Sequence, residues 1–298
     1  PRSVATRSPL EMWLLFAAGS AVFAGMTAIL AKVGIRQTPS NLATAIRTVV
    51  VLGFAWLVVF LTGSQGTIGR LSVTTVVFLV LSGAATGASW LCYFRALQLA
   101  DVNQVTPVDR SSIVLSVLFA ITLLGETDHL TTRLGGIVII GVGTYLMIER
   151  RAVDGGQPGS WSWLLFASGS AVFAALTSTL GKVGITDIES NLGTAIRTLV
   201  VLVMAWIVVF VTGEHRSLRA IDRRDGWFII ASGVATGASW LCYYRALQIG
   251  PASLVVPIDK LSIVLTVAFA TVFLHERLSR RAALGLAVIV AGTLLMLV

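Results

Sequence analysis

The chain contains the same module twice, offset by 150 positions without a gap. Trp13-Leu14-Leu15-Phe16 recurs as Trp163-Leu164-Leu165-Phe166, and Ser89-Trp90-Leu91-Cys92-Tyr93 recurs as Ser239-Trp240-Leu241-Cys242-Tyr243. The register also holds for individual residues that apolar composition alone does not explain, namely Asn41/Asn191, Arg47/Arg197, Pro107/Pro257, Asp109/Asp259 and Glu126/Glu276. We therefore predict two copies of one structural unit, residues 1–150 and 151–298.

Composition predicts that each unit lies in a lipid bilayer. The chain is 56% hydrophobic and 12% charged, with a mean hydropathy of +0.88. Apolar runs recur in both copies and approach the ~20 residues that cross a hydrocarbon core. Apolar and polar residues do not alternate strictly along these runs, as they would in a membrane β-strand. The first run is too long for a cleavable signal peptide. We expect an all-α integral membrane protein with ten transmembrane helices, five per copy, beginning with runs near 12–34, 42–62, 73–97, 104–124 and 132–148.

Because five is an odd number, the second copy must enter the membrane from the opposite side, so the repeats are predicted to be inverted. Sorting the 22 lysines and arginines by side puts twelve on one face, six on the other and four inside helices. Cytoplasmic loops are enriched in basic residues. This count predicts a multi-pass protein of a bacterial-type cytoplasmic (inner) membrane, with the linker at Arg150-Arg151 inside and both termini outside.

Three segments are distinctive enough to compare with known families. They are Asn41-Leu42-Ala43-Thr44-Ala45-Ile46-Arg47-Thr48, Gly87-Ala88-Ser89-Trp90-Leu91-Cys92-Tyr93-Phe94-Arg95-Ala96-Leu97-Gln98 and Pro257-Ile258-Asp259-Lys260-Leu261-Ser262. These segments resemble the small single-repeat members of the EamA group, within the drug/metabolite transporter superfamily. The resemblance extends over nearly the whole chain, twice, and implies a ten-helix carrier of small metabolites without fixing its substrate. It also implies cytoplasmic termini, in conflict with the charge count, which we keep because it comes from this chain.

Inversion predicts two chemically similar polar clusters at opposite ends of a central cavity. In each copy the loops after the first and third helices open on the same face, and inversion sends the second cluster to the other face. Such paired clusters are the components of alternating access. We expect substrate binding or gating by Asn41, Arg47, Ser89, Trp90, Tyr93 and Asp109, and by their mates Asn191, Arg197, Ser239, Trp240, Tyr243 and Asp259.

Arg47 and Asp109 are the most informative members of this set, because unpaired charges two turns inside a membrane helix are costly. We expect each to have a partner, and a pair between the second and fourth helices would bind solute, carry a proton or act as a gate. A permanent structural salt bridge, or an arginine reaching the interface, explains the pattern equally well. Pro107 and Pro257 either begin the fourth helix or kink it.

Aromatic and basic residues suggest the nature of the solute. Trp90 and Tyr93 are three residues apart and share a helix face, where they would line a cavity or belong to the interfacial aromatic belt. Trp13 and its mate are assigned to the belt or to lipid-facing packing. The clusters carry more positive than negative charge, which favours an anionic, zwitterionic or aromatic solute. Lys32/Lys182 are expected to reach the interface, and Glu126/Glu276 to be solvated loop carboxylates.

Other classes of function find little support in the sequence. Cys92 and Cys242 are interpreted as packing residues, and the three histidines do not recur as pairs, so we expect no metal, no cofactor and no nucleic acid. No catalytic constellation or nucleotide loop is recognisable, which argues against an enzyme. A secondary transporter working as a monomer of two repeats is preferred, with a lipid scramblase or a passive scaffold left as alternatives. The glycine- and alanine-rich fifth and tenth helices are expected to form the scaffold.

Overall fold

The computed structural model describes residues 9–34, 38–99, 105, 108–109, 111–147, 162–273 and 279–297. Within these ranges every regular element is helical. The elements are α1 (Pro9–Gly34), α2 (Ser40–Thr62), the 3-10 helix η1 (Ser64–Arg70), α3 (Val73–Leu99), α5 (Ser112–Leu123), α6 (Leu130–Met147), α7 (Ser162–Gly184), α8 (Ser190–Val211), the 3-10 helix η2 (Glu214–Ala220), α9 (Arg223–Ile249), α10 (Ala252–Lys260), α11 (Ser262–Phe273) and α12 (Arg280–Leu295).

The fourth predicted helix of each copy is interrupted at equivalent positions. In the second copy α10 ends at Lys260 and α11 begins at Ser262, and in the first copy α5 begins at Ser112. Pro257 lies inside α10, where it cannot donate to the carbonyl four residues earlier. The alternative that this proline begins the helix is therefore wrong, and the kink alternative describes it. Pro107 lies outside the described residues.

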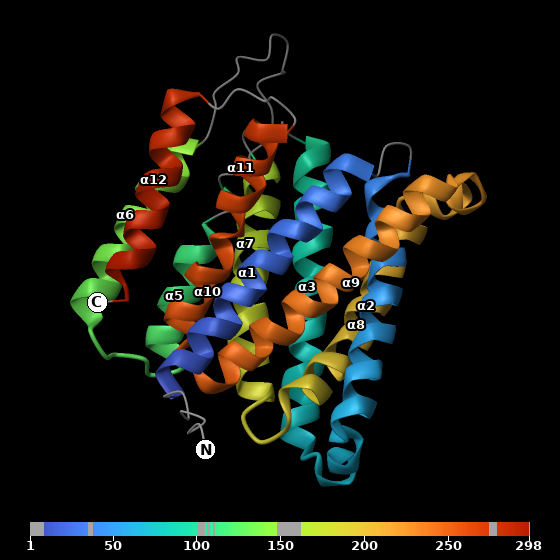
Figure 1. Cartoon of the computed structure of the whole chain (residues 1–298), viewed down its shortest axis with the longest axis horizontal. Helices are drawn as coiled ribbons and strands as arrows, with labels where there is room; N and C mark the ends of the chain where they lie inside the picture. The colour runs from blue at the N-terminus through green and yellow to red at the C-terminus, as the bar shows by residue number, and fades with distance from the viewer. Residues whose placement is uncertain are drawn as a thin grey trace, which may run out of the picture.

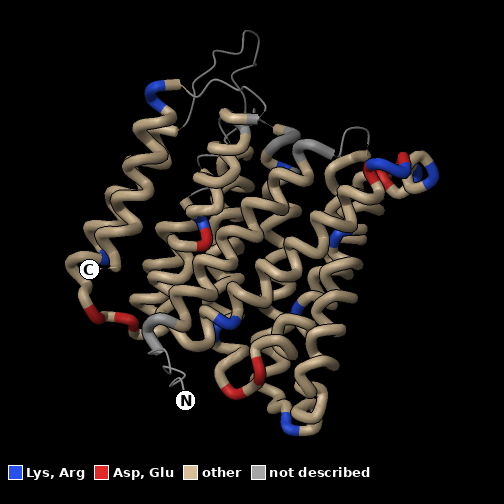
Figure 2. Tube along the Cα trace, in the orientation of Figure 1, with Lys and Arg blue, Asp and Glu red and all other residues tan. Residues whose placement is uncertain are grey.

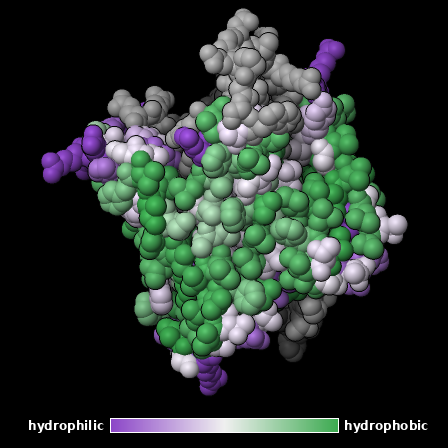
Figure 3. Space-filling view, turned by 180° about the vertical axis from the view of Figure 1, so that it is seen from behind, coloured by the Kyte–Doolittle hydropathy of each residue, from purple (hydrophilic) through white to green (hydrophobic). Residues whose placement is uncertain are grey.

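Within the part of the chain that the structure describes, seven helical segments have the length and apolarity needed to cross a membrane. They are α1, α2, α3, α6, α7, α8 and the combined α10 and α11. The more polar α9 and the shorter α12 are the repeat equivalents of α3 and α6, and α5 is equivalent to α11. Figure 3 shows a broad apolar surface across the middle of one face, with hydrophilic side chains gathered toward its ends. The chain is an all-α integral membrane protein in which each repeat supplies five membrane segments.

The two repeats run in opposite directions. In Figure 1, α1 rises from the lower face while α7 descends from the upper one, and α12 runs downward from the upper face. The lower face carries η1 and the connections from α5 to α6 and from α7 to α8. The upper face carries η2 and the beginnings of α2 and α12. Figure 2 shows that most charged residues lie near these two ends, as a bilayer requires.

Reciprocal packing between the repeats forms the core. The most extensive contacts join α1 to α9 and α3 to α7, which are equivalent pairs, and α2 packs on α8. The sulfur of Cys92 lies 3.5 Å from where a Cβ on Gly169 would sit, and Cys242 approaches Gly19 at 3.6 Å. Both cysteines are free, in agreement with a packing role.

Helices α6 and α12 form a separate pair beside this core. A Cβ added to Gly143 would lie 2.8 Å from the carbonyl oxygen of Gly285, and one added to Gly285 would lie 2.7 Å from that of Gly143. Such close backbone approach is typical of small-residue contacts between membrane helices. The two helices expected to form the scaffold thus pack against one another.

Trp13 lies in the core, so its assignment to the interfacial belt is wrong. Its side chain is 6% exposed and belongs to a cluster that includes Ala246 and Val255. Gly250 makes this possible, because a Cβ there would lie 2.7 Å from Trp13 Cγ. The indole thus packs where α9 leads into α10, near the lower face.

Candidate solute-binding cavity

A cavity of about 400 Å³ lies between the two repeats. Small hydroxyl side chains and aromatic rings form most of its wall, and three basic side chains and one carboxylate reach it. Helices α1, α2, α3 and α5 contribute from one repeat and α7 to α11 from the other, while α6 and α12 contribute no lining residue. The residues that matter below are Thr86, Ser89, Trp90, Arg47, Arg197, Thr236, Ser239, Trp240, Tyr243, Tyr244, Asp259 and Lys260.

Most of the predicted site residues reach this cavity. Eight of the twelve line it, namely Arg47, Ser89, Trp90, Arg197, Ser239, Trp240, Tyr243 and Asp259. Asp109 lines a neighbouring pocket of about 350 Å³, which it shares with Lys260. Tyr93 packs instead in an apolar cluster with Ala96 and Val105.

Asn41 and Asn191 hold carboxylates at helix N-termini, outside the cavity. Glu214 of η2 accepts hydrogen bonds from Asn41 Nδ2 at 2.5 Å and from the backbone nitrogen of Leu42 at 3.0 Å. In the second copy the carboxylate is Glu189, which accepts from the backbone nitrogen and Nδ2 of Asn191 at 2.8 and 2.9 Å. A carboxylate at either N-terminus is favoured by the helix dipole. The two glutamates therefore cap α2 and α8, and the asparagine amides help to hold them in place.

Asp109 and Asp259 are held by serines of the opposite repeat. Ser170 Oγ donates to Asp109 Oδ1 at 2.6 Å, and Ser20 Oγ donates to Asp259 Oδ1 at 2.5 Å. Among the ion pairs of the described residues, neither aspartate is joined to Arg47 or to its mate. The expected arginine–aspartate pair is therefore wrong for this conformation, because cross-repeat serines occupy the carboxylates.

The two equivalent arginines have different surroundings. Arg197 is 2% exposed, and its Nε and Nη2 donate to Ser82 Oγ at 3.2 Å and Thr86 Oγ1 at 2.6 Å. Its guanidinium carbon lies 5.2 Å from the ring centre of Trp240 and 4.6 Å from that of Tyr244. These are cation–π distances.

Arg47 is half-buried, and its hydrogen bond among the described residues is a long one of 3.5 Å to Thr44 Oγ1. The two repeats therefore share the motif that contains this arginine, but the contacts of the arginine differ between them.

The two ends of the cavity are closed to different degrees. Near the Arg197 end, Ser190 and Thr194 are fully buried. Their mates at the Arg47 end differ, since Ser40 is exposed and Thr44 is only partly buried. The lower end, which contains the start of α8, is thus the closed one.

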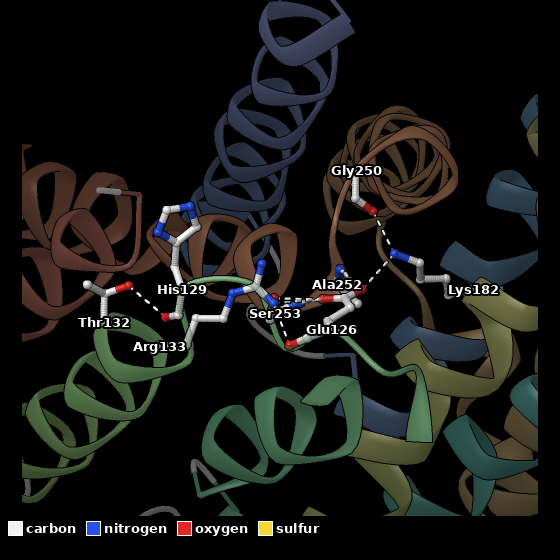
Figure 4. A network of polar contacts seen from close by, with 8 residues as sticks. All are labelled: Glu126, His129, Thr132, Arg133, Lys182, Gly250, Ala252 and Ser253. Atoms are coloured by element: carbon white, nitrogen blue, oxygen red, sulfur yellow. Dashed lines mark hydrogen bonds and ion pairs between the residues drawn. The ribbon is translucent and has the colours of Figure 1, made fainter. Parts of the chain in front are cut away.

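A polar network around Glu126 joins the repeats at this lower end (Figure 4). Glu126 Oε1 accepts from Lys182 Nζ at 2.8 Å and from the backbone nitrogen of Ala252 at 2.7 Å, while Oε2 accepts from the nitrogen and Oγ of Ser253 at 2.9 and 2.6 Å. Lys182 also donates to the carbonyl oxygen of Gly250 at 2.7 Å. The carboxylate therefore caps α10 and binds the end of α7.

Burial and charge act in opposite directions on Glu126. Desolvation on its own would raise the pKa of the carboxyl, but the neighbouring Lys182 charge and the hydrogen bonds from Lys182 and Ser253 lower it below the ordinary value. The side chain is 12% exposed. The expectation of a solvated loop carboxylate is wrong, and so is that of a Lys182 that merely reaches the interface. Lys32 and Glu276 lie outside the described side chains.

Sequence reasoning missed a further contact at the lower end, which lies within the second repeat. Gln248 Nε2 donates to the carbonyl oxygens of Ile185 and Ile188 at 2.8 and 2.5 Å, which joins the end of α9 to the connection between α7 and α8. The recurrence of Glu126 and Lys182 as Glu276 and Lys32 was a usable signal. It could not indicate a partner, because the contacts cross from one repeat to the other.

Comparison with known proteins agrees with this architecture. The sequence profile of the EamA-like transporter family matches residues 11–148 and again residues 161–298. The chain belongs to the EamA-like transporter family. This membership makes it a membrane transporter, as the resemblance of its repeated segments implied, and the two matches fall on the two repeats.

Individual relatives add the single-repeat form. An "Uncharacterized transporter in cobO 3'region" of Sinorhizobium sp is 47% identical over 139 residues, which are 47% of this chain and 99% of that protein. It therefore has the length of one repeat. An "Uncharacterized transporter" of Archaeoglobus fulgidus is 24% identical over 207 residues, 70% of each chain. A solved structure described as "Crystal structure of protein" shares the fold, with a TM-score of 0.74 over 96% of both chains at 18% identity.

Proposed function

We propose that this EamA-family chain is a secondary transporter of small organic solutes that works by alternating access between its inverted repeats. The proposal rests on the different burial of equivalent residues at the two ends of the cavity. Ser190 and Thr194 are buried at the lower end, whereas their sequence equivalents Ser40 and Thr44 are accessible at the upper end. Two copies of one module in two conformations are what an inverted-repeat carrier requires at any moment of its cycle.

The Glu126 network supplies a physical means of holding the lower end closed. It joins the first repeat, through Glu126, to α7 and α10 of the second. In the opposite state, we propose that this network opens and that Glu276 and Lys32 make the equivalent contacts at the upper end. Because a glutamate–lysine pair is available at both ends, the energies of the two networks offset one another in part, and bound solute can shift the balance.

Charge distribution supports an orientation. The upper face carries Arg216, Arg219, Arg223, Arg224, Arg280 and Arg281 among the described residues. We propose that this basic face is cytoplasmic in a bacterial-type inner membrane and that both termini are outside. The conformation is then open to the cytoplasm. A C-terminal alkaline phosphatase fusion tests this orientation: activity is expected in a periplasmic location, and an inactive fusion paired with a fluorescent C-terminal green fluorescent protein fusion would reverse it.

The cavity wall suggests what is carried. Trp90 and Trp240 offer aromatic surface, and Arg47 and Lys260 offer positive charge. An anionic, zwitterionic or aromatic solute fits such a wall. Both repeats of one chain contribute to the cavity wall, and we propose a monomer of two repeats as the working unit. In this proposal the cycle includes no chemical conversion of the solute.

Counterflow in proteoliposomes tests the proposal directly. Vesicles containing the purified protein are loaded with single unlabelled amino acids, organic acids or amines, and uptake of the same labelled solute is followed. Saturable counterflow that is absent from protein-free vesicles is expected. Loss of lipid asymmetry without solute exchange, measured by dithionite quenching of a fluorescent lipid, would instead support a scramblase, and neither activity would support a scaffold.

A further inference from the structure

Arg197 occupies a fully formed docking site for its guanidinium. Two hydroxyl groups of α3, Ser82 and Thr86, accept its hydrogen bonds, and the rings of Trp240 and Tyr244 flank it. None of these partners is a carboxylate. The charge is nonetheless stabilised, because hydroxyl dipoles and aromatic faces replace part of its hydration.

The equivalent dock for Arg47 is vacant. The repeat places Ser232 and Thr236 of α9 where Ser82 and Thr86 stand for Arg197, and α2 packs on α9 as α8 packs on α3. Ser232 is fully buried, and its Oγ has no hydrogen-bond partner among the described residues. A buried hydroxyl without a partner is unfavourable. Ser232 is thus a buried acceptor without a donor, at the position equivalent to the serine that accepts from Arg197. Arg47, the equivalent arginine, does not bind it in this structure.

Arg47 also has no carboxylate partner among the described residues, and unlike Arg197 it has no dock of hydroxyl groups and rings to replace one. Asp259 accepts from Ser20 and lies 3.9 Å from Lys260, and Asp109 accepts from Ser170. No carboxylate of the described residues forms an ion pair with Arg47. A guanidinium exposed to a partly apolar cavity is a strong site for a planar carboxylate, which it can bind through two parallel hydrogen bonds.

We propose that the transported solute carries a carboxylate and that Arg47 binds it in the conformation open at the upper end. As that end closes, Arg47 carries the bound group toward Ser232 and Thr236, while Arg197 leaves Ser82 and Thr86 and becomes the accessible ligand at the lower end. The body of the solute lies between Trp90 and Trp240, in a volume suited to a small monocarboxylate with an apolar or aromatic group. This inference rests on the proposed function.

Binding by matched probes tests the substrate class. The purified protein is titrated with 3-phenylpropionate and with its amide, which has the same shape without the charge, and its thermal stability is followed. Stabilisation by the carboxylate alone is expected, with affinity reduced about tenfold or more in Arg47→Gln and partly retained in Arg47→Lys. Equal effects of acid and amide, no effect of either, or wild-type affinity of Arg47→Gln would overturn the proposal.

The vacant dock gives a second, independent readout. Ser82→Ala removes an acceptor that Arg197 uses, so its melting temperature should fall. Ser232→Ala removes a hydroxyl without a partner, so its melting temperature should not fall, yet carboxylate counterflow should slow because Arg47 must dock there. Equal stability losses in the two variants, or unchanged counterflow in Ser232→Ala, would contradict the docking step.

The outcomes separate this inference from the carrier proposal. Saturable counterflow of a neutral or cationic solute, with none for any carboxylate, would overturn the substrate class and leave the carrier intact. Arg47-dependent binding of 3-phenylpropionate without counterflow of any solute would overturn the carrier and leave the anion site.

Discussion

Replacing Glu126 by glutamine should open the lower end of the cavity. The carboxylate accepts four hydrogen bonds, two on each oxygen, from Lys182, Ala252 and Ser253. Glutamine keeps the size but removes the charge and turns one oxygen into a donor. If Oε1 is replaced, Lys182 Nζ and the Ala252 nitrogen lose their acceptor. If Oε2 is replaced, the Ser253 nitrogen loses its acceptor and the Ser253 hydroxyl must turn to accept, so two hydrogen bonds to the charged group are lost in either case.

The size of the effect follows from these contacts. Hydrogen bonds to a charged group contribute about 1.5–3 kcal/mol each, so losing two of them costs the closed state at least about 3 kcal/mol. The open state loses little, because water solvates the same groups there. Since about 1.4 kcal/mol corresponds to a factor of ten, the open population should rise about a hundredfold.

Cysteine labelling measures that population. Cys92 and Cys242 are replaced by alanine, and a single cysteine is placed at Ser190, which is fully buried in the closed state. Its rate of reaction with a water-soluble maleimide should rise about a hundredfold in Glu126→Gln, in proportion to the open fraction. Reaction at the already exposed Ser40→Cys reports general changes in reactivity.

Glu276→Gln is the matched control, because it makes the same chemical change in the other repeat. Labelling at Ser190→Cys should not rise in that variant. A folded Glu126→Gln protein that labels at the wild-type rate would refute the argument, since the network would then contribute nothing to closing the lower end.

Three further predictions concern the pH dependence of the Glu126 contacts and two glycines at close helix contacts. The closed state lowers the pKa of Glu126, so the ionised carboxylate contributes fully to the stability of the folded protein above the ordinary value of 4.5. This stabilisation is lost as pH falls through the lowered pKa. The difference in melting temperature between wild type and Glu126→Gln should therefore be constant from pH 8 to 6 and shrink below pH 4.5. Gly181→Ala should also raise labelling at Ser190→Cys, because its Cβ would lie 2.6 Å from Tyr244 Cε1 in the closed state; unchanged labelling would contradict this. Gly143→Leu should lower the melting temperature by separating α6 from α12, whereas Leu at the open position Gly53 should not, and equal losses would argue against the close contact.

The fold could be predicted from the sequence because the features that determine it are local to each segment and occur in both repeats. Helix length follows from bilayer thickness, and the odd number of segments requires inversion. The same reasoning placed Arg47 and Trp90 near a central cavity. It could not distinguish their conformations from those of Arg197 and Trp240, since identical motifs predict identical surroundings. In the proposed mechanism, the difference between the repeats is a property of the conformational state.

Contacts between the repeats were the hardest feature to anticipate. Ser20 holds Asp259 and Ser170 holds Asp109, although 239 and 61 positions separate them. A charged residue inside a membrane helix indicates that it has some partner. The sequence offered Arg47 in the second helix and Asp109 in the fourth as opposite charges, so they were predicted to pair. Hydroxyl groups supplied the partner instead, and Glu126 found its partners in α7 and α10. Such choices depend on tertiary packing, which a sequence pattern does not specify.

Distances across both ends of the cavity test alternating access most directly. Spin labels at Asp128 and Asp187 report on the lower end, and labels at Ser40 and Ser279 report on the upper end. With a solute identified by counterflow, the account predicts a second population in which the lower distance is longer and the upper distance shorter. Distances that stay fixed at both ends, or that lengthen together, would contradict a carrier built from two repeats that open in turn.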